Sequence, residues 1–400
     1  MNGHILTCNA GSGSFKSALF CADSLELLCR LSADYHEDPS VLRITNAQGE
    51  EKNRIPLNEA NSRASVEAVL DWVGKQKDIG IKAVGHRVVH GGERLTRPVR
   101  LNDEVLEEMK KLNPLAPLHQ PHNITPITHI CNFMPDLPQI VCFDTSFHAT
   151  QSQEAKTYAL PRELREKGIR RYGFHGLSYE YIASCLDLLP EKNRDRVIVA
   201  HLGSGCSACA LKDGKSFATT MGLTALEGLM MRTRCGDLDP GAVLYLLREE
   251  GYAPQELEKL LYLESGLKGM AGGAGDMREI LNTKEKDEKA RMAFELFCFM
   301  AAREIGGLAA VLGGMQALIF TGKVGELAHK TRARICEYFT WMGLRLDESA
   351  NEQNEETICA NGSSVIVRAM ETNEALMIAR HTKRLTQGKE FPNGKERSAA

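Results

Sequence analysis

The sequence predicts an α/β protein of two lobes, each built around a mixed β-sheet. Apolar segments with strand character alternate with segments whose apolar residues recur every three to four positions, as in helices. Each half of the chain opens with a strand, a Gly/Ser turn and a returning strand, at residues 4–20 and again at 196–211. This similarity, although short, suggests an internal duplication. We expect ligands to meet in a cleft between the lobes.

The first half of the chain begins with three short strands and then alternates helices with strands. Ser65 is a candidate N-cap for the first helix. The proline-rich segment 113–121 is expected to be a loop. In order, we expect strands at 4–8, 15–20 and 25–32, a helix at 65–75, a strand at 83–89, a helix at 105–112 and a strand at 139–143.

The second half repeats the opening hairpin and is richer in helices. Its most apolar stretch, 293–312, carries three charged residues, so we expect a buried helix there rather than a membrane span. In order, we expect strands at 196–202 and 206–211, helices at 240–250, 254–265 and about 285–312, a strand at 317–321, a βα loop at 322–325 followed by a helix, a strand at 364–367 and a helix at about 372–385.

Composition narrows the function classes. The 400 residues are 43% apolar and 25% charged, with a formal net charge of −3 and basic residues spread along the chain, which argues against a nucleic-acid partner. The N-terminus lacks the features of a signal peptide, so we expect a cytoplasmic protein with no membrane partner. The 12 cysteines occur singly, as in a reduced cytosolic enzyme. One C-x-x-C, Cys206 to Cys209, falls in a strand, where residues three apart point to opposite faces.

Three glycine-containing turns could contact phosphate through backbone N–H groups. The first, residues 9–14, includes Ser12 and is followed by Lys16, but it is not a Walker A sequence. The second is 201–205, and the third, 322–325, lies between a strand and a helix, whose N-terminus could face phosphate. Taken singly, the first two turns fit an ordinary hairpin turn better than a phosphate site, whereas the third fits a tight βα turn and a phosphate site equally well.

Charged residues beside strand ends and glycines are more distinctive. Arg87 and His90 flank a glycine pair, and an arginine can fork two hydrogen bonds to a carboxylate or a phosphate. Asp144 ends an apolar strand, and Arg234 lies in Thr-Arg-Cys-Gly-Asp. His119 and His175 lie in loops, although a single histidine more often has a structural role. These are groups that phosphoryl transfer uses to position and neutralise its reactants.

Together the motifs resemble the acetate kinase family. The resemblance runs from about Ile5 to Leu385, with the order and separations of the motifs preserved. The motifs are HRVVHGG (86–92), LAPLH (115–119), FDTSFH (143–148), RRYGFHG (170–176), HLGSG (201–205), MGLTALEGLM (221–230), TRCGD (233–237) and TNEA (372–375).

This resemblance implies the acetate/sugar kinase–Hsc70–actin fold, with two duplicated actin-like, ribonuclease H-like lobes. It implies an N-terminal lobe at 1–149, a C-terminal nucleotide-binding lobe at 150–375 and a polar tail at 389–400. A last helix, at about 376–388, would return to the first lobe. The family implies ATP as co-substrate with Mg²⁺ or Mn²⁺, acetate or another short-chain carboxylate as acceptor, and a homodimer.

The resemblance also implies roles for individual residues. Asn9 and Glu374 match the pair associated with Mg²⁺, and Arg87 matches the arginine that binds the carboxylate. Asp144 matches the catalytic aspartate. His175 and Arg234 match residues that stabilise the phosphoryl group during transfer, and His119 matches a supporting contact. Ser12 and Lys16 match contacts with the donor phosphate. The residues that match the lining of the alkyl pocket are Val89, Leu118, Phe174 and Ala225. The nucleotide-binding matches are His201, Gly203, Ser204 and Gly205, then Asp276, Met277 and Arg278, and finally Lys323, Val324, Gly325, Glu326 and Leu327.

The sequence departs from the family near both ligands. Ser204 replaces a usual asparagine, and Lys323 and Leu327 replace the first glycine and the asparagine of GIGEN. These changes leave pyrophosphate open as the donor beside ATP. Ala225 replaces a proline and Arg232 a glycine, which leaves a propionate or butyrate preference open beside acetate. A third alternative is a binding paralogue without efficient turnover, although retention of all the charged site residues argues against it.

Overall fold

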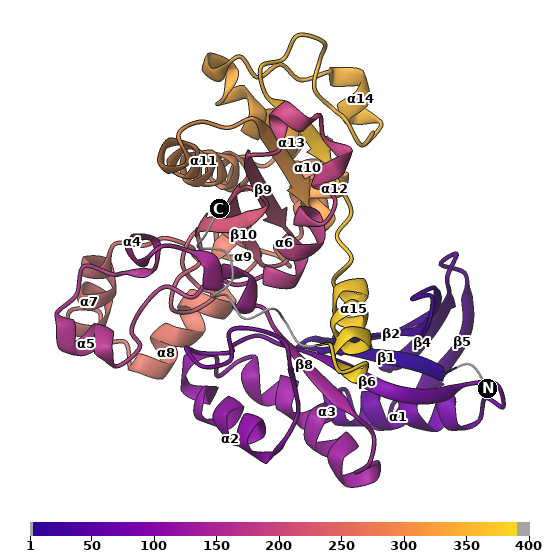
Figure 1. Ribbon diagram of the computed structural model, residues 1–400. Helices are drawn as coiled ribbons and strands as arrows, with labels where there is room; N and C mark the ends of the chain where they lie inside the picture. The colour runs from indigo at the N-terminus through magenta and orange to yellow at the C-terminus, as the bar shows by residue number, and fades with distance from the viewer. Residues whose placement is uncertain (1–2, 390–400) are drawn as a thin grey trace, which may run out of the picture. The chain divides into compact units, whose positions relative to one another are not determined.

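The computed structural model describes residues 3–389, and the chain divides into two compact units (Figure 1). Unit 1 combines the chain up to Ser146 with the chain from Asn373 onward, and unit 2 is Phe147–Thr372. The predicted polar tail lies outside the described residues apart from Lys389. Over residues 3–389, no helix combines the length and the apolar character needed to cross a bilayer.

Unit 1 is built on an eight-stranded sheet with the order β5-β4-β3-β2-β1-β6-β8-β7. Strands β1 to β5 form an antiparallel meander, and β1, β6 and β8 are parallel neighbours. The strands are β1 Gly3–Ala10, β2 Ser14–Cys21, β3 Leu27–Asp34, β4 Val41–Asn46, β5 Glu51–Pro56, β6 Gly80–Val88, β7 Val99–Arg100 and β8 Gln139–Phe143. The helices are α1 Ser62–Gly74, α2 Asp103–Lys111, α3 Gln120–Phe133 and α15 Glu374–Thr386.

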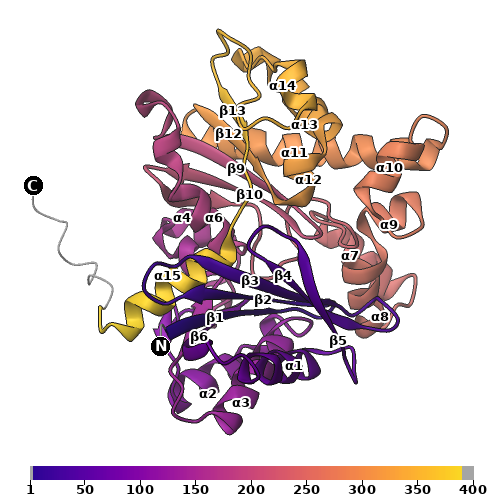
Figure 2. The ribbon, with the colours of Figure 1, turned by 90° about the vertical axis from the view of Figure 1, so that its right-hand side faces the viewer.

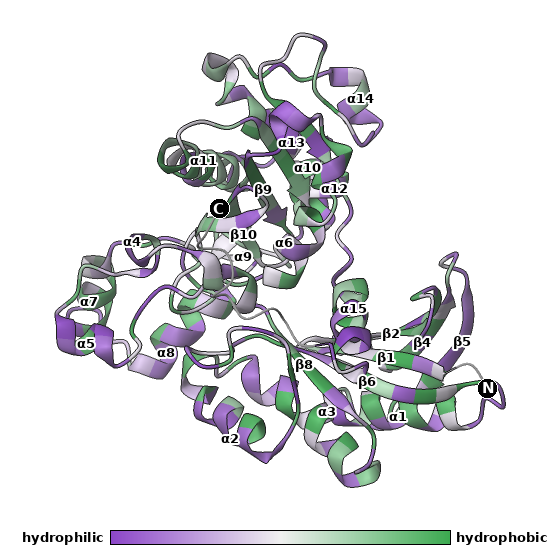
Figure 3. Ribbon diagram, in the orientation of Figure 1, coloured by the Kyte–Doolittle hydropathy of each residue, from purple (hydrophilic) through white to green (hydrophobic). Residues whose placement is uncertain are grey.

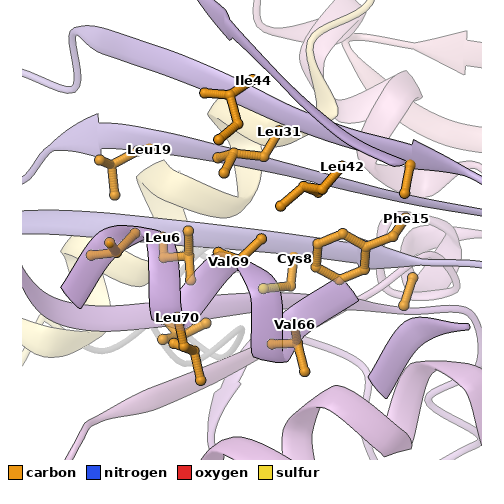
Figure 4. Packing of buried hydrophobic residues seen from close by; sticks show 14 of the residues in the cluster. Leu6, Cys8, Phe15, Leu19, Leu31, Leu42, Ile44, Val66, Val69 and Leu70 are labelled. Carbon is orange, nitrogen blue, oxygen red and sulfur yellow. The ribbon is translucent and has the colours of Figure 1, made fainter. Parts of the chain in front are cut away.

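The sheet of unit 1 is covered on both faces, which explains why β1 is buried at every position except Asn9. Leu6 and Cys8 point towards α1 and pack with Val66 and the rest of that core cluster (Figure 4). The alternate residue Ile5 points the other way and packs against Ala379 of α15. Figure 2 shows α15 on one side of the sheet and α1 with α3 on the other.

Unit 2 is built on a five-stranded sheet with the order β11-β10-β9-β12-β13. Strand β9 pairs antiparallel with β10 and parallel with β12, which pairs parallel with β13. The strands are β9 Arg196–Leu202, β10 Cys206–Lys212, β11 Lys215–Thr219, β12 Ala317–Thr321 and β13 Ile366–Ala369. The helices are α4 Gln153–Lys156, α5 Arg162–Glu166, α6 Gly176–Ala183, α7 Pro240–Arg248, α8 Pro254–Lys259, α9 Gly266–Ala271, α10 Met277–Thr283, α11 Glu288–Leu312, α12 Gly322–Leu327, α13 His329–Glu337 and α14 Glu348–Glu352.

The two faces of the unit 2 sheet are covered by α6 and α11. Tyr179 and Ile182 of α6 pack with Val197 and Val199 of β9 in one buried cluster. Helix α11 packs against β9 and β10, and Figure 3 shows it hydrophobic along much of its length, whereas α13 is hydrophilic. The predicted buried helix at 293–312 is therefore confirmed.

The two sheets share a five-strand core of the same design. In unit 1 the order β3-β2-β1-β6-β8 places an antiparallel three-stranded meander beside two further parallel strands, and in unit 2 the order β11-β10-β9-β12-β13 does the same. The duplication suggested by two short hairpins thus extends to strand order and direction.

Several local predictions were wrong. Asn61, not Ser65, caps α1, because its side chain accepts from the N–H of Ala64. Strands β4 and β5 were not predicted, since β5 is exposed and polar and lacks the apolar alternation of a buried strand. The loop predicted at 322–325 is itself the start of helix α12.

The C-x-x-C of the sequence behaves as buried structure. Cys206 and Cys209 both lie on β10, and burial raises the pKa of each thiol to about 12. Both thiols therefore stay protonated at neutral pH and are poor nucleophiles.

Candidate active site

The predicted site residues of unit 1 gather where parallel strands end. Asn9 lies near the end of β1, Arg87 near the end of β6, and Asp144 directly follows β8. Because these strands are parallel neighbours, their C-terminal ends meet at one edge of the sheet, where α/β proteins commonly bind ligands. Glu374, the first residue of α15, reaches the same edge.

Arg87 is the centre of this group. Its Nε and Nη2 donate to the two carboxylate oxygens of Asp144 at 3.1 and 2.5 Å, and its Nη1 donates to Oδ1 of Asn9 at 3.1 Å. Nδ2 of Asn9 in turn donates to Oε2 of Glu374 at 3.3 Å. We call Asn9, Arg87, Asp144 and Glu374 the arginine cluster.

The arginine cluster is a buried ion pair with capacity left for an anion. Asp144 is 1% exposed, and the side chain of Arg87 is 16% exposed. Burial opposes the charge of the guanidinium, but the negative charges of Asp144 and Glu374 outweigh that effect and raise the pKa of Arg87. Three of its five N–H groups are used within the cluster. The other two can donate to a carboxylate.

Two residues predicted to contact donor phosphate lie on the same hairpin as Asn9. Lys16 lies opposite Asn9 in the β1–β2 ladder, and Ser12 lies in the turn. Both are exposed. Among residues 3–389, the side chain of neither residue forms a hydrogen bond with the arginine cluster, so their predicted phosphate contacts depend on a ligand.

The predicted alkyl-pocket residue Val89 is fixed by a helix that the sequence did not predict. Val89 is buried, and its N–H donates to Oδ1 of Asn123 on α3 at 2.9 Å. Gln120 of the same helix accepts from the N–H of His90 at 3.1 Å and donates to its carbonyl at 3.0 Å. The amide residues Gln120 and Asn123, which closely follow His119, could have suggested this role, but the prolines favoured a loop.

The two remaining predicted residues of this region, Leu118 and His119, stand immediately before α3. Both are half-buried, and His119 occupies the N-cap position. Although Leu118 and His119 are far from Val89 in sequence, the hydrogen bonds of Gln120 and Asn123 hold the start of α3 next to Val89 and His90.

In unit 2, two imidazole rings stack on each other. The ring centroids of His175 and His201 are 4.3 Å apart, with 20° between the ring planes. Each ring is anchored at Nδ1 by a serine hydroxyl at 2.8 Å, Ser207 for His175 and Ser178 for His201. Both rings therefore direct Nε2 away from their anchors.

The glycine turn after β9 lies against these rings. A Cβ atom on Gly203 would lie 3.4 Å from Nε2 of His201, and one on Gly205 would lie 3.3 Å from Nε2 of His175 and 3.7 Å from Nη1 of Arg234. Glycine keeps this space open for the approach of a ligand to the backbone. We call His175, His201, Arg234 and the turn 203–205 the histidine cluster.

Sequence and fold both match known proteins. The model of the Acetokinase family matches residues 4–380. The chain belongs to the acetokinase family. The predicted family is therefore confirmed. An acetate kinase of Rhodopseudomonas palustris is 46% identical, over 97% of this chain and 100% of the relative.

Solved structures of the acetokinase family share the fold. A propionate kinase from Francisella tularensis has a TM-score of 0.89 at 34% identity, covering 96% of this chain and 99% of that one. An acetate kinase from Porphyromonas gingivalis has a TM-score of 0.85 at 34% identity, covering 96% and 100%. These matches confirm the predicted fold class of two duplicated α/β lobes.

The other two predicted alkyl-pocket residues, Phe174 and Ala225, each accept a hydrogen bond at the backbone carbonyl from another residue of unit 2. Phe174 is buried, and its carbonyl accepts from Nε2 of His148 at 2.9 Å. Burial lowers the pKa of His148 to about 4, so the ring stays neutral. Ala225 is half-buried, and its carbonyl accepts from Nη1 of Arg234 at 2.9 Å.

The three predicted nucleotide-binding segments approach one another through backbone contacts. A Cβ on Gly322 would lie 2.7 Å from the carbonyl oxygen of Leu202, which places the start of α12 beside the turn 203–205. The N–H of Arg232 donates to the carbonyl of Ser204 at 3.2 Å, and its Nε donates to the carbonyl of Ala274 at 2.9 Å. Arg232, one of the departures from the family pattern, thus links the turn to the segment that precedes Asp276.

Within these segments, the side chains differ in exposure. Asp276 caps α10 and is ion-paired with Arg278 at 2.8 Å, whereas Met277 is buried. On α12, Gly325 is buried and Val324 half-buried, and Lys323 and Leu327 are exposed. The pKa of Glu326 is raised, chiefly by burial. The two substituted side chains therefore face solvent or ligand and do not disrupt packing.

Arg332 is a structural residue of this region that sequence reasoning missed. It is fully buried, and its guanidinium donates to the carbonyls of Gly325 and Glu326 at 2.9 and 2.7 Å and to Asn351 and Asn354. These bonds hold the C-terminal end of α12. No motif signalled it, because an isolated arginine on a polar helix usually indicates a solvated face.

Proposed function

We propose that this protein is an acetate kinase that reversibly transfers the γ-phosphoryl group of ATP to acetate, giving acetyl phosphate and ADP. Its place in a family of acetate and propionate kinases supports this activity. The observation that carries the proposal is the arginine cluster, because it combines a guanidinium with two unused N–H donors and a pair of oxygen ligands at one strand edge.

In this proposal, Arg87 binds the carboxylate of the acid. Asp144 holds the guanidinium through two hydrogen bonds and so fixes the direction of its remaining donors. The family resemblance assigns contacts with the alkyl group to Val89 and Leu118 of unit 1 and to Phe174 and Ala225 of unit 2. Acetate is already ionised at neutral pH, so its oxygen can attack the γ-phosphorus while the bond to the bridging oxygen of ADP breaks, and no proton has to be removed.

The histidine cluster would hold the phosphoryl group. Arg234 and Nε2 of His175 donate to the equatorial oxygens, where negative charge is concentrated during transfer. The turn 203–205 and His201 contact the nucleotide phosphates, together with Ser12 and Lys16. Segments 276–278 and 323–327 contact the nucleoside, and His119 supports the transferring group.

Asn9 and Glu374 would hold a divalent cation, Mg²⁺ or Mn²⁺. Their chemistry fits, because an amide oxygen and a carboxylate supply hard oxygen ligands at the same strand edge, and Mg²⁺ typically takes its other ligands from water and substrate phosphates. When bound, the cation would neutralise charge on the phosphates.

A propionate preference is the first alternative. It is favoured by the high TM-score to a propionate kinase and by Ala225, which has a smaller side chain than the family's usual proline. A pyrophosphate donor is the second alternative, favoured by the exposed ammonium of Lys323 at the start of α12.

We further propose a cytoplasmic homodimer. Helix α7 supports this proposal, because it is largely apolar yet has no buried residue, and Leu244 and Tyr245 are 47% and 55% exposed. Light scattering of the purified protein would measure its mass.

One crossed assay tests these alternatives. Trapping acyl phosphate with hydroxylamine would be measured for acetate and propionate, each with MgATP and with magnesium pyrophosphate. We expect the highest kcat/KM with acetate and MgATP. A higher kcat/KM with propionate would identify propionate as the preferred acid, and a higher kcat/KM with pyrophosphate would identify pyrophosphate as the donor. If no combination gave product, the protein would be interpreted as a binding paralogue.

A further inference from the structure

His175 is anchored by a chain of two hydroxyl groups. Its Nδ1 is 2.8 Å from Oγ of Ser207 on β10, and that oxygen is 2.5 Å from the hydroxyl of Tyr179 on α6. Tyr179 and Ser207 are both fully buried. Two oxygen atoms that water cannot reach therefore link the phenol to the imidazole.

The directions of these hydrogen bonds follow from counting protons. Within the described part of the chain, Ser207 is the single hydrogen-bond partner of the Tyr179 hydroxyl. Burial raises the pKa of Tyr179 well above its ordinary value, so the phenol keeps its proton. If Ser207 donated to Tyr179, the phenolic proton would be buried without an acceptor, which is energetically unfavourable. Tyr179 therefore donates to Ser207, and Ser207 donates to Nδ1 of His175.

We infer that Tyr179 and Ser207 are positioning residues that select the tautomer of His175 with its proton on Nε2. This atom points towards the turn 203–205, where a Cβ on Gly205 would lie 3.3 Å from it. In this tautomer the N–H donor of the ring lies on the side of the turn 203–205, where the proposed function places a phosphate oxygen. The inference rests on the proposed function for its catalytic consequence, but the tautomer itself does not depend on it.

Packing and backbone contacts hold Tyr179 and His175 in place. The ring of Tyr179 meets the rings of Phe147 and His148 at centroid distances of 6.4 and 5.7 Å. The N–H of Tyr179 also donates to the carbonyl of His175 at 3.1 Å, and His175 has a left-handed backbone with φ of 57°. Since a non-glycine residue adopts this conformation only when its neighbours impose it, the same helix turn fixes both the backbone and the ring.

His201 supplies a comparison within the same cluster. Its Nδ1 is 2.8 Å from Oγ of Ser178, but no tyrosine in the described part of the chain donates to that serine. The hydroxyl of Ser178 can therefore donate or accept. The hydrogen bond between Ser178 and His201 therefore does not by itself select a tautomer of His201, in contrast to the bond between Ser207 and His175.

The direct test is nitrogen NMR of the full-length protein with 15N-labelled histidine, using His175→Gln to assign the signals. We expect His175 at neutral pH to carry its proton on Nε2. In Tyr179→Phe, we expect a measurable population of the tautomer that carries its proton on Nδ1. A proton on Nδ1 in the wild type, or a wild-type pattern in Tyr179→Phe, would overturn the inference. This readout needs no activity, so it separates failure of the inference from failure of the proposed function.

Kinetics supply the second test. Tyr179→Phe is expected to lower kcat about tenfold and Ser207→Ala between about tenfold and a hundredfold, with KM for MgATP changed less than twofold, because the lost donor acts on the transferring group. Tyr35→Phe is the matched control, because the hydroxyl of Tyr35 also lies within hydrogen-bond distance of a serine hydroxyl, Ser65, at 3.1 Å. Among the described residues, no histidine takes part in that hydrogen bond. The control variant should cost similar thermal stability and leave kcat unchanged. An equal fall of kcat in both Tyr→Phe variants would contradict the inference.

Discussion

The arginine cluster and the histidine cluster hold their hydrogen-bonding side chains in different ways. Arg87 is ion-paired with a buried carboxylate and lies near a second one. In the histidine cluster, neutral groups hold the side chains: Ser207 holds His175, Ser178 holds His201, and a carbonyl accepts from Arg234. The first cluster is a preassembled ion pair, whereas these hydrogen bonds of the second cluster are made to uncharged groups.

This difference predicts different consequences of mutation. Removing Arg87 takes away the guanidinium that is ion-paired with the buried carboxylate of Asp144, so we expect both stability and acid binding to decrease. Removing Arg234 takes a hydrogen-bond donor from the carbonyl of Ala225 and from the thioether of Met231, which are uncharged acceptors, so we expect turnover to fall more than stability.

The largest effect is expected for Arg234→Ala. Turnover should fall by about a thousandfold or more, because a donor to the transferring group is lost. Steady-state kcat would be measured, with urea unfolding as the control for folding, and Arg234→Lys as the matched variant that keeps the charge but loses the planar fork. Full activity in a folded Arg234→Ala protein would refute its assignment.

The second prediction concerns Arg87→Ala. The acid KM should rise at least about tenfold, and the free energy of unfolding should fall by about 3–5 kcal/mol, because a buried carboxylate loses its partner. Urea denaturation measures the stability. The double variant Arg87→Ala/Asp144→Ala should recover part of the loss, since no uncompensated charge remains. A double variant less stable than Arg87→Ala would contradict the ion-pair account.

Stability should also depend on pH through one buried histidine in each unit. Burial lowers the pKa of His86 and of His148 from 6.5 to about 4. Above pH 6.5 both states of the protein hold these rings neutral. Between pH 6.5 and 4 the unfolded chain takes up protons that the folded chain does not. The free energy of unfolding should therefore fall as the pH falls, by about 3 kcal/mol for each histidine.

Urea unfolding at several pH values checks this dependence. His86→Gln should flatten the fall between pH 6.5 and 4, whereas the matched variant His36→Gln, at an exposed histidine, should leave it unchanged. Equal slopes in wild type and His86→Gln would contradict the prediction.

The smallest of the four effects is expected at the metal-binding pair. Glu374→Gln keeps the shape of the side chain and removes its charge, so half-maximal activity should require about tenfold more Mg²⁺, with kcat restored at saturation. Glu371→Gln is the matched control on an exposed neighbour. An unchanged Mg²⁺ requirement in Glu374→Gln would remove this residue from the metal site.

The sequence predicted the charged residues of both clusters better than the residues that hold them. Arg87, Asp144 and His175 stand out because charged groups next to glycines and strand ends are unusual. Ser207 and Tyr179 do not, because they lie in apolar segments whose pattern indicates only a buried strand and a helix. Their role depends on the contact between β10 and α6, which no local pattern contains.

Helix α3 and strand β5 show the same limit for the fold. Proline at the start and inside α3 lowers the helical tendency of a segment whose tertiary contacts nevertheless stabilise it. Strand β5 is held by its pairing with β4 rather than by burial. Elements with a clear apolar period, such as α11 and β9, were predicted correctly because burial on the sheet determines them.

The division of labour between the two clusters is tested most directly by calorimetric titration of MgADP into Arg87→Ala, beside the acid KM of the same variant. The account predicts a Kd for MgADP within about twofold of the wild type together with a raised acid KM. Loss of MgADP binding with an unchanged acid KM would contradict it.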